Sequence, residues 1–277
     1  MTRSPARRLA LILSGLLLGA WTLVPLIWLM LVAVLPPVDL GSQPPVIDLT
    51  RASLDRFGSL LGDDRFVFAM LNSLQAAAGT TVVTVIIASL AAYAIARLDM
   101  KGKRLILGGT LATQMVPGIV LVIPVFIIMR QFRLTDTILA LVLLYTTFLL
   151  PYAIWLLQNF FNSVPKSLES AARMDGCSRI GTLFRIVLPV SAPGIAATAI
   201  FVFISSWNEF LFALVVTSQN ATTITIRLAQ IQSTIFGGQD FATVGTAGAL
   251  MVLPVLAIVI IFNRYIAYGL TEGAVRG

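Results

Sequence analysis

The sequence predicts an all-α membrane protein with six transmembrane helices. Hydrophobic residues make up 58% of the chain and charged residues only 11%, whereas soluble domains carry about 25% charged residues. The mean hydropathy is +0.94, and the apolar residues fall into six long stretches separated by polar loops. Each stretch is long enough to cross a hydrocarbon layer of roughly 30 Å as a helix.

The first apolar stretch, 9–35, follows a basic start that contains Arg3, Arg7 and Arg8. A basic start before an apolar run is also typical of a signal peptide. The run has about 27 residues, which exceeds the 7–15 residues of a signal core, and no small-x-small cleavage site follows it. We therefore expect a transmembrane helix followed by a polar loop, which together form the segment 1–66.

Five further spans follow, and the third span of the chain is interrupted by proline. Pro117-Gly118 and Pro124 lie inside it, and a proline within a helix removes a hydrogen bond and clashes with the preceding turn. The second to sixth spans form a transmembrane domain over 67–266, and a short tail, 267–277, follows it. These five spans are predicted at 68–96, 105–129, 138–161, 190–216 and 241–265.

The distribution of basic residues predicts the orientation of the spans. Thirteen of the 19 Lys and Arg residues lie in the N-terminal segment, 97–104, 162–189 and the C-terminal stretch 264–277, and the other six lie in the alternating loops. Because cytoplasmic loops are enriched in Lys and Arg, we expect both termini and the loop 162–189 in the cytoplasm. The loop after the first span is then extracytoplasmic. Basic residues spread between spans form no patch, so the net charge of +7 does not indicate nucleic-acid binding.

The loop 162–189 is the longest polar interruption in the second half of the chain, and its pattern predicts two short helices. Pro165 suits a first helical turn, where its missing N–H is not needed. Gly176 is placed where a helix ends in a left-handed residue, and Ser178 suits the N-cap of the next helix.

Side chains of this loop can be assigned to faces from their spacing. Glu169 and Arg173 are four residues apart, so we expect an ion pair on the helix surface, and we expect Thr182 to face solvent. The adjacent Ala171 and Ala172 let another backbone approach closely. A plain interpretation is a pair of amphipathic helices lying on the membrane surface.

A family resemblance favours a more specific interpretation. The loop resembles the E-x-A-A-x-x-x-G…I-x-L-P motif of permease subunits of bacterial ATP-driven (ABC) importers of the binding-protein-dependent type. Ser170 stands where that family commonly has Ala. In that family the loop is the cytoplasmic coupling helix that enters a groove of a separate ATPase subunit, which implies that Glu169 meets a basic or amide group there. The resemblance implies a coupling role for Glu169, Ala171, Ala172, Arg173, Asp175, Gly176 and Pro189.

The resemblance extends over nearly everything from residue 66 onwards. The tail is similar to the G-L-T-x-G-A-V-K-G ending of maltose-type permeases, with Arg276 in place of the usual Lys, and Asp136-Thr137 also fits the family pattern. In the best-known relative the tail reaches between the ATPase subunits. That likeness implies ATPase contacts for Gly269, Leu270, Thr271 and Gly273.

Four residues are candidates for the solute pathway. Glu209 is the only acidic residue inside a predicted span, and a carboxylate there must face the bundle interior, an aqueous cavity or the outer surface. Trp207 and Asn208 precede it in a stretch that resembles the W-N-E-F signature of the carbohydrate-importing branch. Gln114 lies in the broken third span. The alternative role for Glu209 is a polar clamp that fixes helix packing, and Asn72-Ser73 is expected to be structural.

Absent residues exclude several kinds of site. The chain has no histidine and a single cysteine, which rules out histidine triads, HExxH zinc sites, intrachain disulfides and cysteine-rich metal sites. No G-x-x-x-x-G-K-[ST] motif occurs, so the chain has no phosphate loop. We therefore expect no cofactor or metal on this chain, with ATP and Mg²⁺ held by partner ATPase subunits.

The resemblance implies a non-catalytic permease subunit, of the maltose-type second-permease kind, for a sugar or sugar-like solute in the bacterial cytoplasmic membrane. Its implied partners are membrane lipid, a homologous sister permease, an ATP-binding-cassette ATPase dimer and an extracytoplasmic solute-binding protein. Amino sugars and glycerophosphodiesters are alternative solutes within the same class.

Two other classes of protein remain as alternatives. An ion-coupled secondary transporter normally carries several intramembrane acids or histidines and an inverted repeat, whereas this chain has one such acid, Glu209, and no evident repeat. An intramembrane enzyme without histidine would need a rarer pair such as Ser–Lys, and no lysine lies in a predicted span.

Overall fold

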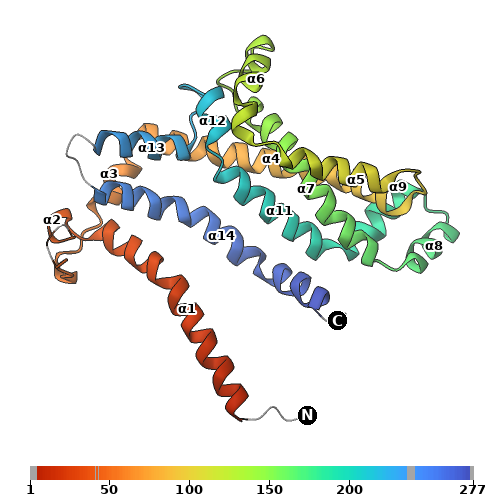
Figure 1. Cartoon of the computed structure of the whole chain (residues 1–277), viewed down its shortest axis with the longest axis horizontal. Coiled ribbons are helices and arrows are strands. Elements are labelled where there is room, and N and C mark those ends of the chain that lie inside the picture. The colour runs from red at the N-terminus through yellow and green to blue at the C-terminus, as the bar shows by residue number, and fades with distance from the viewer. Residues whose placement is uncertain (1–4, 41, 43, 236–240, 275–277) are drawn as a thin grey trace. The chain divides into compact units, whose positions relative to one another are not determined.

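The computed structural model describes residues 5–40, 42, 44–235 and 241–274, with the side chains of residues 5–8, 10, 40, 233–235 and 263–274 outside this description. Every regular element in the described part is a helix (Figure 1). The chain divides into two compact units: residues 1–67 with 227–254, and residues 68–226 with 255–277.

The prediction of an all-α membrane protein is confirmed. Within the described residues, four helices are by themselves long and apolar enough to cross a membrane, and two bent helix pairs raise the number to six if each pair is one span. The four single helices are α1 (Pro5–Val34), α4 (Asp64–Arg97), α7 (Ile138–Ser163) and α14 (Phe241–Ala274).

The interruption predicted in the third span is confirmed. α5 (Lys103–Ala112) and the 3-10 turn η2 (Thr113–Met115) end before Pro117, and α6 (Gly118–Gln131) starts after it at an angle of 94°. Val116 has extended backbone, with φ −75° and ψ 119°, because the proline ring disfavours helical backbone in the residue before it.

The fifth predicted span, 190–216, is not one continuous helix. α11 (Ala192–Trp207) ends at the polar pair Asn208-Glu209, and the six-residue α12 (Leu211–Val216) follows. A bend of 81° also separates α11 from the helical run 179–190 that precedes it. The physical reason lies in proline, which lacks a backbone N–H, on both sides of this bend, and in polar side chains that bond to nearby backbone.

The unit made of 1–67 and 227–254 joins the N-terminal helix to α14. A Cβ on Gly245 would lie 2.5 Å from Cγ1 of Val32, so glycine permits this close approach. The hydroxyl of Thr246 donates to the carbonyl of Ala33 over 3.1 Å, and Arg56 donates to three carbonyls at the end of α1. The unit also holds α2 (Pro37–Leu40), η1 (Leu49–Arg51), α3 (Asp55–Leu61) and most of α13 (Ile224–Ile235).

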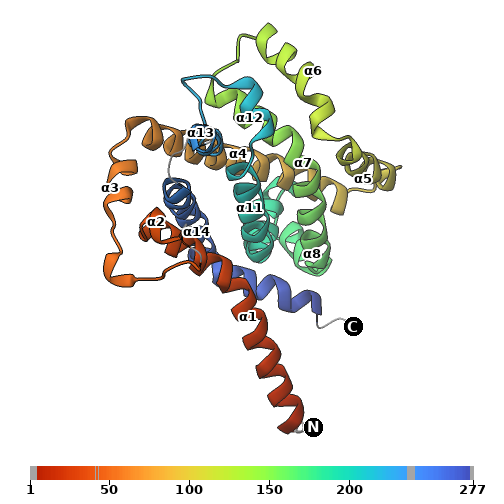
Figure 2. The same ribbon diagram turned by 60° about the vertical axis from the view of Figure 1, so that its left-hand side comes forward.

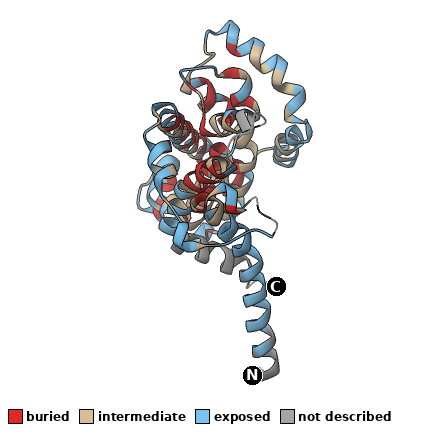
Figure 3. Cartoon of the chain, turned by 90° about the vertical axis from the view of Figure 1, so that its left-hand side faces the viewer, coloured by how far each residue is buried: buried red, intermediate tan, exposed pale blue. Residues whose placement is uncertain are grey.

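Most of α1 is exposed along its length, and only 6% of its most apolar stretch is buried (Figure 3). An apolar helix with so little burial leaves its side chains to lipid or to a neighbouring chain.

In the unit around 68–226, α4 contributes small residues to the packed core. Ala88, Ala92 and Ala96 recur every fourth residue on α4, and all three are buried. α7 and α11 lie side by side in this unit (Figure 2). Small residues at helix contacts are the usual solution inside a membrane, because lipid provides no hydrophobic force between helices and packing must bring backbones close.

Asn72 and Ser73 have the structural role that the sequence suggested. The side-chain amide of Asn72 donates to the carbonyls of Asn220 and Thr222 over 3.1 and 3.0 Å. The hydroxyl of Ser73 accepts from the backbone N–H of Ile224 over 2.8 Å. Both residues are buried and hold the segment 220–224 against the start of α4.

Candidate ATPase-coupling site and pathway residues

The loop 162–189 folds into two short helices, as predicted. α8 (Lys166–Met174) begins just after Pro165, which serves as its N-cap with φ −59° and ψ 128°. Ser178 caps α9 (Arg179–Thr182) by accepting a hydrogen bond of 3.0 Å from the backbone N–H three residues later. The predicted cap is therefore confirmed.

The turn between these helices requires glycine. Gly176 has φ +84°, its N–H donates to the carbonyl of Arg173 over 3.1 Å, and the N–H of Cys177 donates to the carbonyl of Ala172 over 3.0 Å. This is a Schellman arrangement, in which a left-handed residue lets the chain satisfy the last carbonyls of a helix. The predicted left-handed helix end is confirmed.

The ion pair predicted between Glu169 and Arg173 is wrong. Glu169 is 6% exposed, and its carboxylate forms an ion pair with Arg97 at the end of α4. Arg173 Nε donates instead to the backbone carbonyl of Glu169 over 3.4 Å. A buried carboxylate is costly unless it is paired, and the paired cation lies 72 residues away in the sequence, where helical spacing cannot indicate it.

Arg97 is the residue of this site that sequence reasoning missed. In the sequence, a lone arginine between an apolar span and a basic turn indicates only the orientation of the span. In the structure its guanidinium also donates to the carbonyls of Phe161 and Val164 over 2.6 and 2.9 Å. The hydroxyl of Tyr93 donates to the second carboxylate oxygen of Glu169 over 3.3 Å.

The exposed side of the loop presents large apolar side chains. Met174 is 88% exposed, and three further large apolar residues, Leu168, Ile180 and Phe184, are also exposed. The predicted coupling residues divide into an exposed and a buried group. Ala171, Arg173, Asp175, Gly176 and Pro189 are exposed, whereas Glu169 and Ala172 are buried.

Thr182 does not face solvent, so that expectation is wrong. It is 1% exposed, and its hydroxyl donates to the carbonyl of Ser178 over 3.0 Å. After α9 the chain continues through a π-helical turn, η3 (Leu183–Val187), and α10 (Leu188–Val190). The wider turn departs from the α-helical periodicity on which the expectation rested.

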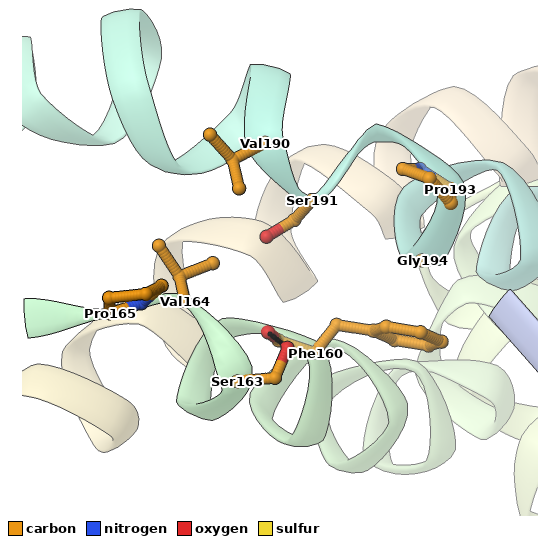
Figure 4. Close-up of a pocket in the computed structure, with 8 residues that line it drawn as sticks. All are labelled: Phe160, Ser163, Val164, Pro165, Val190, Ser191, Pro193 and Gly194. Atoms are coloured by element: carbon orange, nitrogen blue, oxygen red, sulfur yellow. Dashed lines mark hydrogen bonds between the residues drawn. The ribbon is translucent and has the colours of Figure 1, made fainter. Parts of the chain in front are cut away.

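A hollow of about 170 Å³ lies where the end of α7, the start of α8 and the bend before α11 meet. Figure 4 shows the Ser191 hydroxyl directed into this space opposite Val164. Ser191 is 4% exposed and its hydroxyl oxygen has no hydrogen-bond partner in the described structure. The Ser163 hydroxyl is bonded to the carbonyl of Phe160 over 2.7 Å. Ser191 is thus the one side-chain hydroxyl in the lining of this hollow that is without a hydrogen-bond partner. We therefore interpret the hollow as a gap where helices meet and not as a binding site.

All four pathway candidates make contacts within the chain. Trp207 is 1% exposed and its ring stacks with that of Phe203 at 6.1 Å between centroids. Gln114 is exposed but donates its side-chain amide to the carbonyl of Phe148 over 2.7 Å. The ring of Phe148 stacks on Phe212 of α12 at 4.3 Å, so Gln114 is attached to the same packed group as α12.

Glu209 lies at the helix break and caps α12. Its two carboxylate oxygens accept from the backbone N–H groups of Phe212 and Ala213 over 2.8 and 3.1 Å, and its own carbonyl accepts from the Thr225 hydroxyl over 2.8 Å. A carboxylate that accepts the free N–H groups at a helix start stabilises that helix. Asn208 is exposed, and its side-chain amide donates to the carbonyl of Ile204 over 2.8 Å. These contacts favour the polar-clamp role for Glu209.

Asp136 holds a loop by a cluster of hydrogen bonds. It has φ +59°, and its carboxylate accepts from the backbone N–H groups of Ser218, Gln219, Asn220 and Ala221 at 2.9–3.2 Å. Burial raises the pKa of the Asp136 carboxyl, but the backbone N–H groups of Asn220, Ser218 and Ala221 together outweigh it and lower the pKa well below 3.8. The sequence indicated only that Asp136 fits a family pattern.

The proposed tail contacts lie outside the described side chains. α14 extends to Ala274 as a helical backbone. Gly269, Leu270, Thr271 and Gly273 belong to the part of α14 for which no side-chain surroundings are described.

With this geometry in place, comparison with known proteins decides the family. The family described as "Binding-protein-dependent transport system inner membrane component" matches residues 84–271. The chain belongs to this family. The permease is therefore a multi-pass translocation subunit of the inner membrane, as the 162–189 motif indicated.

Individual relatives match the permease along its length. It is 36% identical over 267 residues to the trehalose transport system permease protein SugB of Mycobacterium tuberculosis, covering 96% of both chains. It is also 36% identical over 281 residues to the trehalose/maltose transport system permease protein MalG of Thermococcus litoralis, covering 100% of both.

The permease also shares its fold with a solved structure. A chain of a bacterial ABC transporter involved in the import of the acidic polysaccharide alginate superposes with a TM-score of 0.75 and 20% identity, over 96% of this chain and 99% of that chain.

Proposed function

We propose that this permease moves a sugar or sugar-like solute across the cytoplasmic membrane, as one half of a pathway completed by a homologous sister permease. The observation that carries the proposal is full-length similarity, at 36% identity, to permeases named for trehalose and for trehalose/maltose transport. An ATPase dimer holding ATP and Mg²⁺ and an extracytoplasmic solute-binding protein complete the importer. The dependence on a binding protein is supported by the family description.

The exposed side of α8 and α9 is the proposed docking surface for the ATPase. Leu168, Met174 and Ile180 are exposed there, as is Phe184 in the following turn η3. All four lie on a loop between two spans. A group of exposed apolar residues on such a loop is typical of a protein contact. The basic asymmetry of the sequence supports placing this surface in the cytoplasm, where ATP is available.

Uptake by a reconstituted complex tests the proposal. The permease, its sister permease, the ATPase and the binding protein would be reconstituted in liposomes and offered radiolabelled trehalose, maltose, diacetylchitobiose and glycerophosphocholine. We expect ATP-dependent accumulation of a disaccharide. The control is the same complex with an ATPase that cannot hydrolyse ATP. Accumulation that follows an ion gradient without ATP would instead indicate a secondary transporter.

A further inference from the structure

Arg97 connects three helices through one side chain. Its guanidinium pairs with the Glu169 carboxylate of α8 and donates to the carbonyls of Phe161 and Val164 at the end of α7 over 2.6 and 2.9 Å. Arg97 is itself the last residue of α4. A planar fork of five N–H donors can serve a carboxylate and two carbonyls at once, which the single ammonium of lysine cannot match.

The connection is enclosed within the protein. The side chains of Arg97 and Glu169 are 8% and 7% exposed. The hydroxyl of Tyr93, one turn earlier on α4, donates to Glu169 over 3.3 Å. Little solvent competes with such a pair, so it keeps a fixed geometry, and removal of one partner leaves a buried charge without compensation.

The chain connection into α8 is short and comes from α7, whereas the ion pair comes from α4. α7 ends at Ser163 and α8 begins at Lys166, so only two residues join them. The ion pair approaches α8 from α4 instead, four residues into the helix. The direction of α8 is thereby tied to two membrane helices at separate points.

We propose that Arg97 is a positioning residue that transmits movement of α8 to the end of α4. This role rests on the proposed function, in which α8 docks on an ATPase. When the ATPase shifts α8, the Arg97–Glu169 pair moves the end of α4 with it. The hydrogen bonds from Arg97 to the carbonyls of Phe161 and Val164 make the end of α7 move together with α4.

The test separates transmission from stability. Arg97→Met combined with Glu169→Met removes both buried charges at once, so neither is stranded. Both side chains are buried against each other and lie outside the exposed docking surface. We therefore expect this double variant to co-purify with the ATPase at the wild-type level and to hydrolyse ATP, while the solute moved per ATP falls at least tenfold. Arg97→Lys keeps the positive charge but loses several of the N–H donors of the guanidinium. We expect the solute moved per ATP to lie between the values for the wild type and the double variant. Arg104→Gln, which changes an exposed arginine in the first turn of α5, is the matched control.

The outcomes distinguish this role from the proposed function. A double variant that assembles and moves the wild-type amount of solute per ATP would show that Arg97 only stabilises the fold. If the double variant does not assemble, Arg97→Lys decides, and a wild-type ratio there overturns the role equally. A wild-type complex without ATPase association would overturn the proposed function and this role together.

Discussion

At the scale of single residues, the coupling motif contains positions of two kinds. Gly176 is required by the local backbone, because its φ of +84° is a conformation that residues with a side chain rarely adopt. Glu169 makes a long-range contact, since its ion-pair partner Arg97 belongs to another helix. The first kind can be read from neighbouring residues in the sequence, and the second cannot.

Substitution of Gly176 should separate backbone strain from side-chain contact. A side chain at Gly176 meets open space, so the cost of Gly176→Val is conformational, about 1–2 kcal/mol in the free energy of the turn. We expect uptake to fall at least tenfold while the protein remains in the membrane, and Gly176→Asn to retain most uptake because asparagine tolerates this conformation.

Gly102 offers a matched control for this prediction. It has φ +81° and equally open surroundings in the turn before α5, so Gly102→Val introduces the same strain away from α8. Equal losses of uptake in Gly102→Val and Gly176→Val would contradict a specific coupling role for the turn at Gly176.

Asp136 makes a pH-dependent contribution to stability. Its folded pKa is lowered from 3.8, so the stabilisation is complete above the unfolded value and is lost as the pH falls through the folded value. Asp136→Asn should lower the free energy of unfolding by about 1–2 kcal/mol at pH 7, at the low end for charged hydrogen bonds because the group is partly solvated.

Thermal unfolding of the detergent-solubilised protein measures this effect. The difference between wild type and Asp136→Asn should stay constant from pH 7 to about pH 5 and shrink below about pH 4. A difference that grows on acidification would contradict the assigned role of the carboxylate.

At the scale of elements, one glycine, Gly194 of α11, allows α7 and α11 to lie close together. A Cβ on Gly194 would lie 2.2 Å from Cγ of Phe160, which is far shorter than a van der Waals contact. The clash involves the ring atoms nearest the backbone, which a change of side-chain torsion moves least. This contact lies beside the bend of 81° that leads into α11. The bend and the close approach together determine how the loop 162–189 is attached to α11.

Gly194→Ala should therefore push these helices apart. Overpacking of this kind costs about 1–3 kcal/mol, and we expect a lower unfolding temperature and a lower yield of the complex. Phe160→Ala combined with Gly194→Ala should recover part of the loss, because alanine lacks the Cγ and Cδ atoms that the added Cβ would meet. Wild-type stability of Gly194→Ala alone would mean that the contact is looser than the structure has it.

At the scale of the whole molecule, the orientation in the membrane is the property that determines where the docking surface lies. Single cysteines at Ser42 and Gln219, in a Cys177→Ser background, should react with an impermeant thiol reagent in intact cells. A cysteine at Ser178 should react only after the membrane is opened. All three parent residues lie in loops between predicted spans, so access depends on the side of the membrane. Labelling at position 178 from outside would reverse the orientation and remove the coupling proposal.

The sequence by itself determined the membrane class, the broken third span, the left-handed Gly176 and the cap at Ser178. Each depends on composition or on residues within a few positions of one another, where proline, glycine and apolar length act locally.

Only the tertiary structure decided the partner of Glu169, the burial of Thr182, the loop held by Asp136 and the cap that Glu209 gives α12. The Glu169 and Asp136 contacts join segments far apart in the sequence, so they exist only once helices have packed in one arrangement. The burial of Thr182 and the cap on α12 depend on where helices turn or break. A periodic pattern identifies the face of a helix, but it does not identify what that face will meet.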